Sequence, residues 1–213
     1  MKMLSGLRPD GSRSLAFFAV SFCTAFLSFS APVAAKTLPP AAEFVQRLGD
    51  TALMSLTDKH LPRKTREERV RKILEDNFDV KAIGRFAIGP YWRQATGAQR
   101  KEYMKYFEDL IVETYTSRFE AYSGQTLKVY GARPSGDTDY IVDSKVLQKT
   151  AGPIELQWRV RKEDGGLRIV DVIVAGVSMS FTQRSDFMSV IQNEGGLEGL
   201  ISSLRKRHEE NRG

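Results

Sequence analysis

The sequence predicts an α+β fold in which N- and C-terminal helices pack on a curved antiparallel sheet of about four strands and enclose an apolar cavity. Two observations predict this class. Apolar residues recur at helical spacing over 40–124 and again over 180–207, whereas over 127–177 they alternate with a period of two. The connections between these segments are short, which favours one compact domain over residues 36–213.

The first helices are indicated by signals at their ends. One helix opens at Pro39 and Pro40 and ends before Pro62, with an apolar face between them. Thr65–Glu68 has the pattern of a capping box and predicts the start of a second helix. Asp79 is placed to cap a short third helix.

The longest helix is predicted between a break and a glycine. Gly89 and Pro90 interrupt the short helix that precedes it. Thr96–Gln99 is a second capping box, and apolar residues at helical spacing then continue to Phe119. Gly124 is expected to end this helix.

Four segments with a two-residue period predict an antiparallel meander. They cover residues 127–131, 140–147, 154–161 and 167–177. The third alternates cleanly, which indicates one wet face and one buried face, and Asp164–Gly166 predicts a hairpin turn into the fourth. The fourth is apolar at both parities, which places it in the centre of the sheet.

Two more helices are predicted at the C-terminal end. Ser180, with Gln183 three residues later, marks the start of the first, and Gly195 and Gly196 interrupt the pattern. The last helix is amphipathic and ends in the basic run Arg205–Arg207, which suits the negative end of the helix dipole.

Residues 1–35 have the pattern of a secretory signal peptide. A basic start is followed by an apolar run from Leu15 to Phe29 and by small residues that fit a cleavage site after Ala35. Cleavage there is expected to yield an exported protein. The alternative is an uncleaved anchor, because the stretch from Ser14 to Ala35 is just long enough to span a bilayer.

The composition excludes several protein classes. The chain has 213 residues, of which 41% are hydrophobic and 27% charged, and this rules out a collagen, a disordered tail and a polytopic membrane protein. Removal of residues 1–35 takes away three basic residues, one acidic residue and the one cysteine, so the formal net charge falls from +6 to +4. Acidic neighbours dilute the basic cluster over residues 63–72, so no nucleic-acid partner is expected.

The sequence carries no recognisable catalytic or metal-binding motif. Neither His60 nor His208 lies at metal-ligand spacing from another histidine or a cysteine, so no metal site and no cofactor are expected. Asp143 and Asp171 lie in otherwise apolar strands, where a buried carboxylate can do acid–base chemistry. We favour the plainer interpretation that both are solvated or paired with arginine on the outer face of the sheet.

Large apolar residues are abundant in both the helices and the strands. A sheet that curls against helices can leave an apolar cavity for a ligand. The same pattern also fits a solid core, which periodicity alone does not exclude. Inward-facing positions supply the candidate wall of such a cavity: Phe78, Phe86, Trp92, Phe107, Leu110, Ile111, Val142, Val146, Leu156, Trp158 and Val160.

Short motifs recur in order along nearly the whole chain after the leader. They are Asn77–Asp79, Gly89–Arg93, Phe107–Leu110, Thr114–Tyr115, Tyr122–Gly124, Asp164–Gly166, Asp171–Val172, Ala175–Met179, Gln183–Phe187 and Gly195–Leu200. As an ordered set they resemble the MlaC family of periplasmic phospholipid-binding proteins, also called the toluene-tolerance family. Ala175, where many members carry an acidic residue, and Thr182–Ser185 are closer to the hopanoid-associated branch of that family.

The resemblance implies a periplasmic carrier that holds phospholipid or hopanoid-type lipid tails in its cavity and performs no covalent chemistry. The implied partners are an inner-membrane ABC transporter with an MCE-domain subunit and an outer-membrane lipoprotein–porin complex. The cavity-wall residues given above would then be the lipid-binding residues, a choice that rests on inward parity and not on a family motif.

Two other functions remain open at the level of sequence. A small periplasmic enzyme would use Asp171 or Asp143 as its buried carboxylate, so an Asp→Asn change would abolish turnover and spare lipid uptake. A non-catalytic adaptor would have a solid core, so a bulky substitution such as Val142→Trp would destabilise its fold instead of blocking lipid.

Overall fold

The computed structural model describes residues 38–211, and the predicted signal peptide and cleavage site lie outside these described residues. The helices are α1 (Pro40–Leu56), α2 (Arg63–Asn77), α3 (Val80–Ile88), α4 (Tyr91–Gln94), α5 (Gly97–Glu120), α6 (Met179–Asn193) and α7 (Gly196–Glu210). The strands are β1 (Thr126–Ser135), β2 (Asp139–Leu147), β3 (Ile154–Glu163), β4 (Gly166–Val174) and β5 (Val177–Ser178). This arrangement confirms the predicted α+β class.

The strands form one antiparallel sheet in sequence order, β1-β2-β3-β4-β5. The prediction of one strand over 167–177 is wrong, because the chain turns back after Val174. Ala175 and Gly176 make this turn with φ angles of 49° and 83°, in the left-handed region that favours glycine. The two residues of β5 then pair with Ile173 and Val174 at the end of β4.

The prediction that β4 is central is also wrong, since beyond it lies only the short β5. Part of its edge is instead occupied by the junction between α2 and α3. The backbone N–H of Asp79 donates to the carbonyl of Ile169 at 3.0 Å, and Phe78 forms an isolated parallel bridge with Ile169. Because α2, α3 and α6 all contact β4, its apolar side chains are at least partly covered although it lies near the sheet edge.

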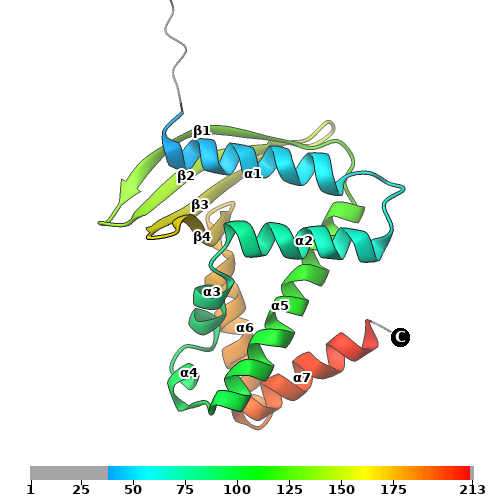
Figure 1. Cartoon of the computed structure of the whole chain (residues 1–213), viewed down its shortest axis with the longest axis vertical. Helices are drawn as coiled ribbons and strands as arrows, with labels where there is room; N and C mark the ends of the chain where they lie inside the picture. The colour runs from blue at the N-terminus through cyan, green and yellow to red at the C-terminus, as the bar shows by residue number, and fades with distance from the viewer. Residues whose placement is uncertain (1–37, 212–213) are drawn as a thin grey trace, which may run out of the picture. The chain divides into compact units, whose positions relative to one another are not determined.

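Helix α1 lies along one face of the sheet (Figure 1). Ala42 and Val45 of α1 pack against Val142 of β2 and Val160 of β3, and all four side chains have 0% exposure. Successive strand residues point to opposite faces, so this packing fixes the inner face of β2 and β3.

The outer face of these strands is charged. Arg161, next to Val160, donates to both carboxylate oxygens of Asp139 at 2.9 and 3.1 Å, and these hydrogen bonds hold the pKa of Asp139 below its usual range. Asp143 pairs with Arg133 and accepts from Gln157 Nε2 at 2.8 Å. The expectation of an arginine-paired carboxylate on the outer face is therefore confirmed for Asp143.

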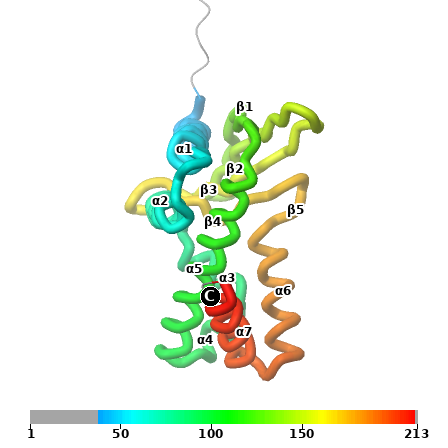
Figure 2. Tube along the Cα trace, turned by 90° about the vertical axis from the view of Figure 1, so that its right-hand side faces the viewer, coloured from blue at the N-terminus to red at the C-terminus, as the bar shows by residue number. Residues whose placement is uncertain are grey.

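The remaining helices form a second hydrophobic cluster. Tyr103 and Phe107 of α5 are fully buried there against Phe187 of α6 and Ile201 of α7. Figure 1 shows α5 running from this cluster up to the sheet, and Figure 2 shows β5 leading into α6. Helix α5 therefore connects the helical cluster to the sheet.

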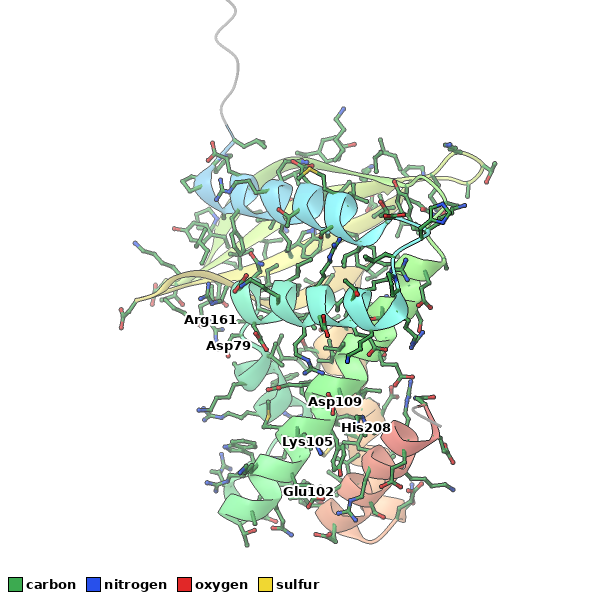
Figure 3. All side chains as sticks on the ribbon, turned by 45° about the vertical axis from the view of Figure 1, so that its right-hand side comes forward. Asp79, Glu102, Lys105, Asp109, Arg161 and His208 are labelled. Carbon is green, nitrogen blue, oxygen red and sulfur yellow. The ribbon has the colours of Figure 1, made fainter. Side chains whose placement is uncertain are left out.

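Polar contacts also attach α7 to α5. His208 Nδ1 lies 3.3 Å from Asp109 Oδ2, and Figure 3 shows these two side chains together between the helices. Asp109 is also bound by Arg71 Nη2 of α2 at 2.7 Å. One carboxylate thus joins three helices at the end of α7.

The residues at which the helices begin confirm two of the capping predictions and contradict two others. Asp79 Oδ1 accepts from Ala82 N at 2.9 Å, and Thr96 and Gln99 form the predicted reciprocal capping box. The box predicted at Thr65 is wrong, because α2 begins at Arg63, with Pro62 in the N-cap position and no side-chain cap hydrogen bond. The start predicted at Ser180 is also wrong: Ser178 caps α6, accepting from Phe181 N at 3.1 Å.

Replacing Thr96 with alanine is expected to lower the free energy of unfolding by about 1 kcal/mol, because the N-cap side chain is lost from the longest helix. Thr65→Ala is the matched control: Thr65 lies inside α2, where alanine is the better helix former, so no loss of stability is expected. Urea denaturation of both variants measures the difference. Equal losses would contradict the assignment of these two helix starts.

Candidate functional site

A large apolar cavity lies between α1, the C-terminal end of α5 and the inner face of β1–β3. Its volume is about 480 Å³, within the range of roughly 300–1,000 Å³ that is typical of small-molecule sites. Helix α1 contributes Leu48, Gly49, Ala52 and Leu53 to its wall. The sheet contributes Leu127, Val146, Ile154, Leu156 and Trp158, with the remaining wall from α5 and the loop after it.

The indole N–H in the sheet wall of this cavity is satisfied within the protein. Trp158 donates from Nε1 to Ser144 Oγ at 2.9 Å, and Ser144 donates to the carbonyl of Leu156 at 3.1 Å. The indole therefore needs no hydrogen bond from a ligand and offers its rings as apolar surface. Such a wall suits hydrocarbon.

A second cavity of about 240 Å³ lies between α2, α3, α5, α6 and β4. Its apolar lining includes Phe78 from the end of α2, Phe107, Leu110 and Ile111 from α5, and Val172 from β4. Four of the predicted wall residues thus meet in this space.

Asp171 lies in the second cavity with 9% exposure, so the expectation that it is solvated or paired with arginine is wrong. Its carboxylate accepts from Ser178 Oγ at 2.6 Å, from Ser180 N at 3.0 Å and from Ser180 Oγ at 2.7 Å. These bonds tie β4 to the turn that begins α6. Both oxygens are therefore engaged in holding the fold.

Tyr115 and Arg118 of α5 line both cavities. The guanidinium carbon of Arg118 lies 5.4 Å from the centre of the Tyr115 ring. Burial raises the pKa of Tyr115, an effect that nearby Arg118 opposes and Asp171 reinforces. Tyr115 therefore stays a neutral phenol at neutral pH and forms part of the boundary between the two cavities.

Comparison with known proteins explains this architecture. The MlaC protein family model matches residues 46–206. The chain belongs to the MlaC family. It is 26% identical over 141 residues to the intermembrane phospholipid transport system binding protein MlaC of Haemophilus influenzae, a match that covers 64% of this chain and 65% of that relative.

A solved structure matches over a longer stretch. It is the phospholipid-binding protein from Ralstonia solanacearum in complex with a phospholipid, with 27% sequence identity and a TM-score of 0.70. The match covers 81% of this chain and 99% of that one. Together with the family match, it confirms the fold and the family that the ordered motifs predict.

Nine of the eleven predicted wall residues fall into three groups in this MlaC-family chain. Val146, Leu156 and Trp158 line the larger cavity, and Phe78, Phe107, Leu110 and Ile111 line the smaller one. Val142 and Val160 belong to the packed core under α1 and line neither cavity. A bulky residue at Val142 therefore disrupts packing whether or not a cavity exists, so this position does not test the adaptor hypothesis.

Phe86 and Trp92 also lie apart from the two cavities. Phe86 lines a separate, smaller pocket with Phe181 and meets that ring edge-on at 5.0 Å. Trp92 packs against the helical cluster, with the guanidinium groups of Arg85 and Arg100 at 5.7 and 5.5 Å from its ring. The sequence pattern placed both residues at inward-facing apolar positions. It did not distinguish a packed position from a position in the cavity wall.

Sequence reasoning missed the contribution of α1 to the site. Its apolar face is visible in the sequence, but nothing local shows that this face covers the sheet. Sequence reasoning also missed Tyr115 and Arg118 as residues of the cavity walls. Their signal in the sequence is an arginine one turn after a tyrosine near the C-terminal end of a long helix. This signal becomes informative only once the two cavities are known.

Across residues 38–211, no cluster of three or more His, Cys, Asp or Glu side chains is arranged to hold a metal ion. None of the helices in the same stretch combines the length and hydropathy needed to cross a bilayer.

Proposed function

We propose that this MlaC-family chain is a periplasmic carrier that binds the acyl tails of a phospholipid in its apolar cavities and moves the lipid between the outer and inner membranes. The observation that supports it most is the cavity of about 480 Å³ between α1 and the sheet. It occurs in a fold shared with a protein solved in complex with a phospholipid.

The energetics of tail burial suit a carrier. Each CH₂ group removed from water contributes about 0.8 kcal/mol, so ten contribute about 8 kcal/mol. A bilayer buries the same groups, so this contribution nearly cancels when a lipid moves between a membrane and the protein. The tails are thus protected from water during transit, while uptake and release remain possible at either end.

The proposed location and transport route are supported by the N-terminal segment and by the family of the chain. Residues 1–35 fit a signal peptide, which would deliver the mature chain to the periplasm. There the proposed donors and acceptors are an outer-membrane lipoprotein–porin complex and an inner-membrane ABC transporter with an MCE-domain subunit. The relative from H. influenzae carries the name of a binding protein of an intermembrane phospholipid transport system.

Native mass spectrometry of the protein purified from periplasm is expected to show a one-to-one complex with a lipid. Fragmentation of the complex identifies the cargo and separates a phospholipid from a hopanoid-type lipid. The proposal fails if the protein is always ligand-free and takes up no lipid from phospholipid vesicles.

A further inference from the structure

Tyr115 and Arg118 occupy a special position because they belong to the walls of both cavities. They are one turn apart on α5, so their side chains lie on the same face of the helix. Tyr115 is half-buried and Arg118 is exposed. A molecule bound at Arg118 thus has an apolar space of about 480 Å³ on one side and one of about 240 Å³ on the other.

The positive charge of Arg118 is available to a ligand. The nearest acidic residue along the helix, Glu120, is held by Arg63 at 3.0 Å and by Arg66 at 3.3 Å. Within residues 38–211, no carboxylate lies within 4.0 Å of the Arg118 side-chain nitrogens. An exposed guanidinium without a carboxylate partner is well suited to bind a phosphate through two parallel hydrogen bonds.

Arg118 also has no basic competitor in the cavities. Every other lining residue of either cavity is neutral or acidic. The acidic ones are Asp171, which Ser178 and Ser180 occupy, and Asp186, which is exposed on α6. An anionic group that enters with a lipid therefore meets its one basic partner at the boundary between the two spaces.

We propose that a two-tailed phospholipid straddles Tyr115, with one acyl tail in each cavity and its phosphate on Arg118. This inference rests on the proposed function and specifies the cargo. A forked site takes two separate flexible chains, whereas a rigid polycyclic lipid has a single body that cannot divide around Tyr115. The two cavities differ in volume, so the site also distinguishes the two tails.

Filling the smaller cavity with a bulky side chain tests whether one acyl tail occupies each cavity. Thr114 lines that cavity and not the larger one, so Thr114→Trp is expected to weaken binding of dipalmitoyl phosphatidylglycerol by at least about tenfold. Binding of one-tailed palmitoyl lysophosphatidylglycerol is expected to change less than about twofold, because its tail can use the larger cavity. Thr114→Phe serves if the tryptophan variant does not fold, as judged by circular dichroism.

Other outcomes of this experiment overturn the inference. If Thr114→Trp leaves the two-tailed lipid unaffected, both tails share the larger cavity. If it weakens both lipids equally, the smaller cavity is not a separate tail site. Failure of the wild-type protein to bind any of these lipids would instead refute the proposed function, so the two failures are distinguishable.

Removing the charge tests the phosphate contact. Arg118→Gln is expected to weaken dipalmitoyl phosphatidylglycerol about tenfold and to leave neutral dipalmitoylglycerol unchanged. Arg207→Gln is the matched control, since Arg207 is exposed on α7 and lines neither cavity. Equal loss for the charged and neutral lipids, or no loss for either, would overturn the assignment of Arg118.

Discussion

Tryptophan in place of Ala52 is expected to weaken phospholipid binding at least about a hundredfold while the protein stays folded. Ala52 lies on α1, half-buried, with its side chain at the wall of the larger cavity. An indole there displaces roughly four methylene groups, or about 3 kcal/mol at ~0.8 kcal/mol each. Each 1.4 kcal/mol corresponds to about a tenfold change in the dissociation constant.

Two further variants show that the effect comes from the cavity. Met54→Trp lies on the same helix but is 80% exposed, so binding is expected to be unchanged. Val142→Trp adds the same side chain to a fully buried site in the packed core and is expected to unfold the protein. Wild-type affinity in a folded Ala52→Trp protein, measured by lipid titration, would show that the larger cavity holds no tail.

Asp171→Ala is expected to lower the free energy of unfolding by at least about 3 kcal/mol. Hydrogen bonds to a charged group contribute about 1.5–3 kcal/mol each, and this carboxylate accepts three from Ser178 and Ser180. The alanine also leaves the N–H of Ser180, a buried residue, without its partner. Urea denaturation with circular dichroism measures the loss.

Asp143→Ala, on β2 of the same sheet, is the matched control. Its carboxylate is partly exposed on the outer face, where an ion pair such as the one with Arg133 contributes less than about 1 kcal/mol. A small effect at Asp171, comparable to that at Asp143, would contradict its structural role. Normal stability combined with loss of a turnover would favour the small-enzyme hypothesis.

Secondary structure could be predicted where local chemistry decides it. Asp79 and Thr96 cap their helices because each supplies a side-chain acceptor at the required position. Thr65 has the same local pattern, yet Pro62 lets the helix begin earlier. The turn at Ala175 could not be predicted, because a non-glycine residue rarely adopts a positive φ.

The site was harder to predict than the secondary structure. Sequence periodicity shows which face of an element a side chain points to, but it does not show whether that face borders a cavity. Val142 and Val146 lie on the same face of β2, with identical parity, yet the first is in the packed core and the second lines the larger cavity. The difference arises from where α1 meets the sheet and where α5 ends. Both are long-range contacts that no local pattern encodes.

The availability of Arg118 is likewise a tertiary property. From sequence, Glu120 is a nearby carboxylate that could neutralise this part of α5. In the fold, Arg63 and Arg66 of α2 bind Glu120, and Arg118 is left over the ring of Tyr115. Of the three arginines close to this end of α5, two bind Glu120 and Arg118 does not, a division that only the packing of α2 on α5 reveals.

The measurement that tests the central claim most directly is fluorescence quenching by a phospholipid with brominated acyl tails, which quench tryptophan on contact. The chain has two tryptophans: Trp158 lines the larger cavity and Trp92 lines neither. In Trp92→Phe, where Trp158 remains, strong quenching is expected on binding. In Trp158→Phe, where Trp92 remains, fluorescence is expected to stay unchanged. Quenching of Trp92 alone, or of neither residue in protein shown to bind the lipid, would contradict tail binding between α1 and the sheet.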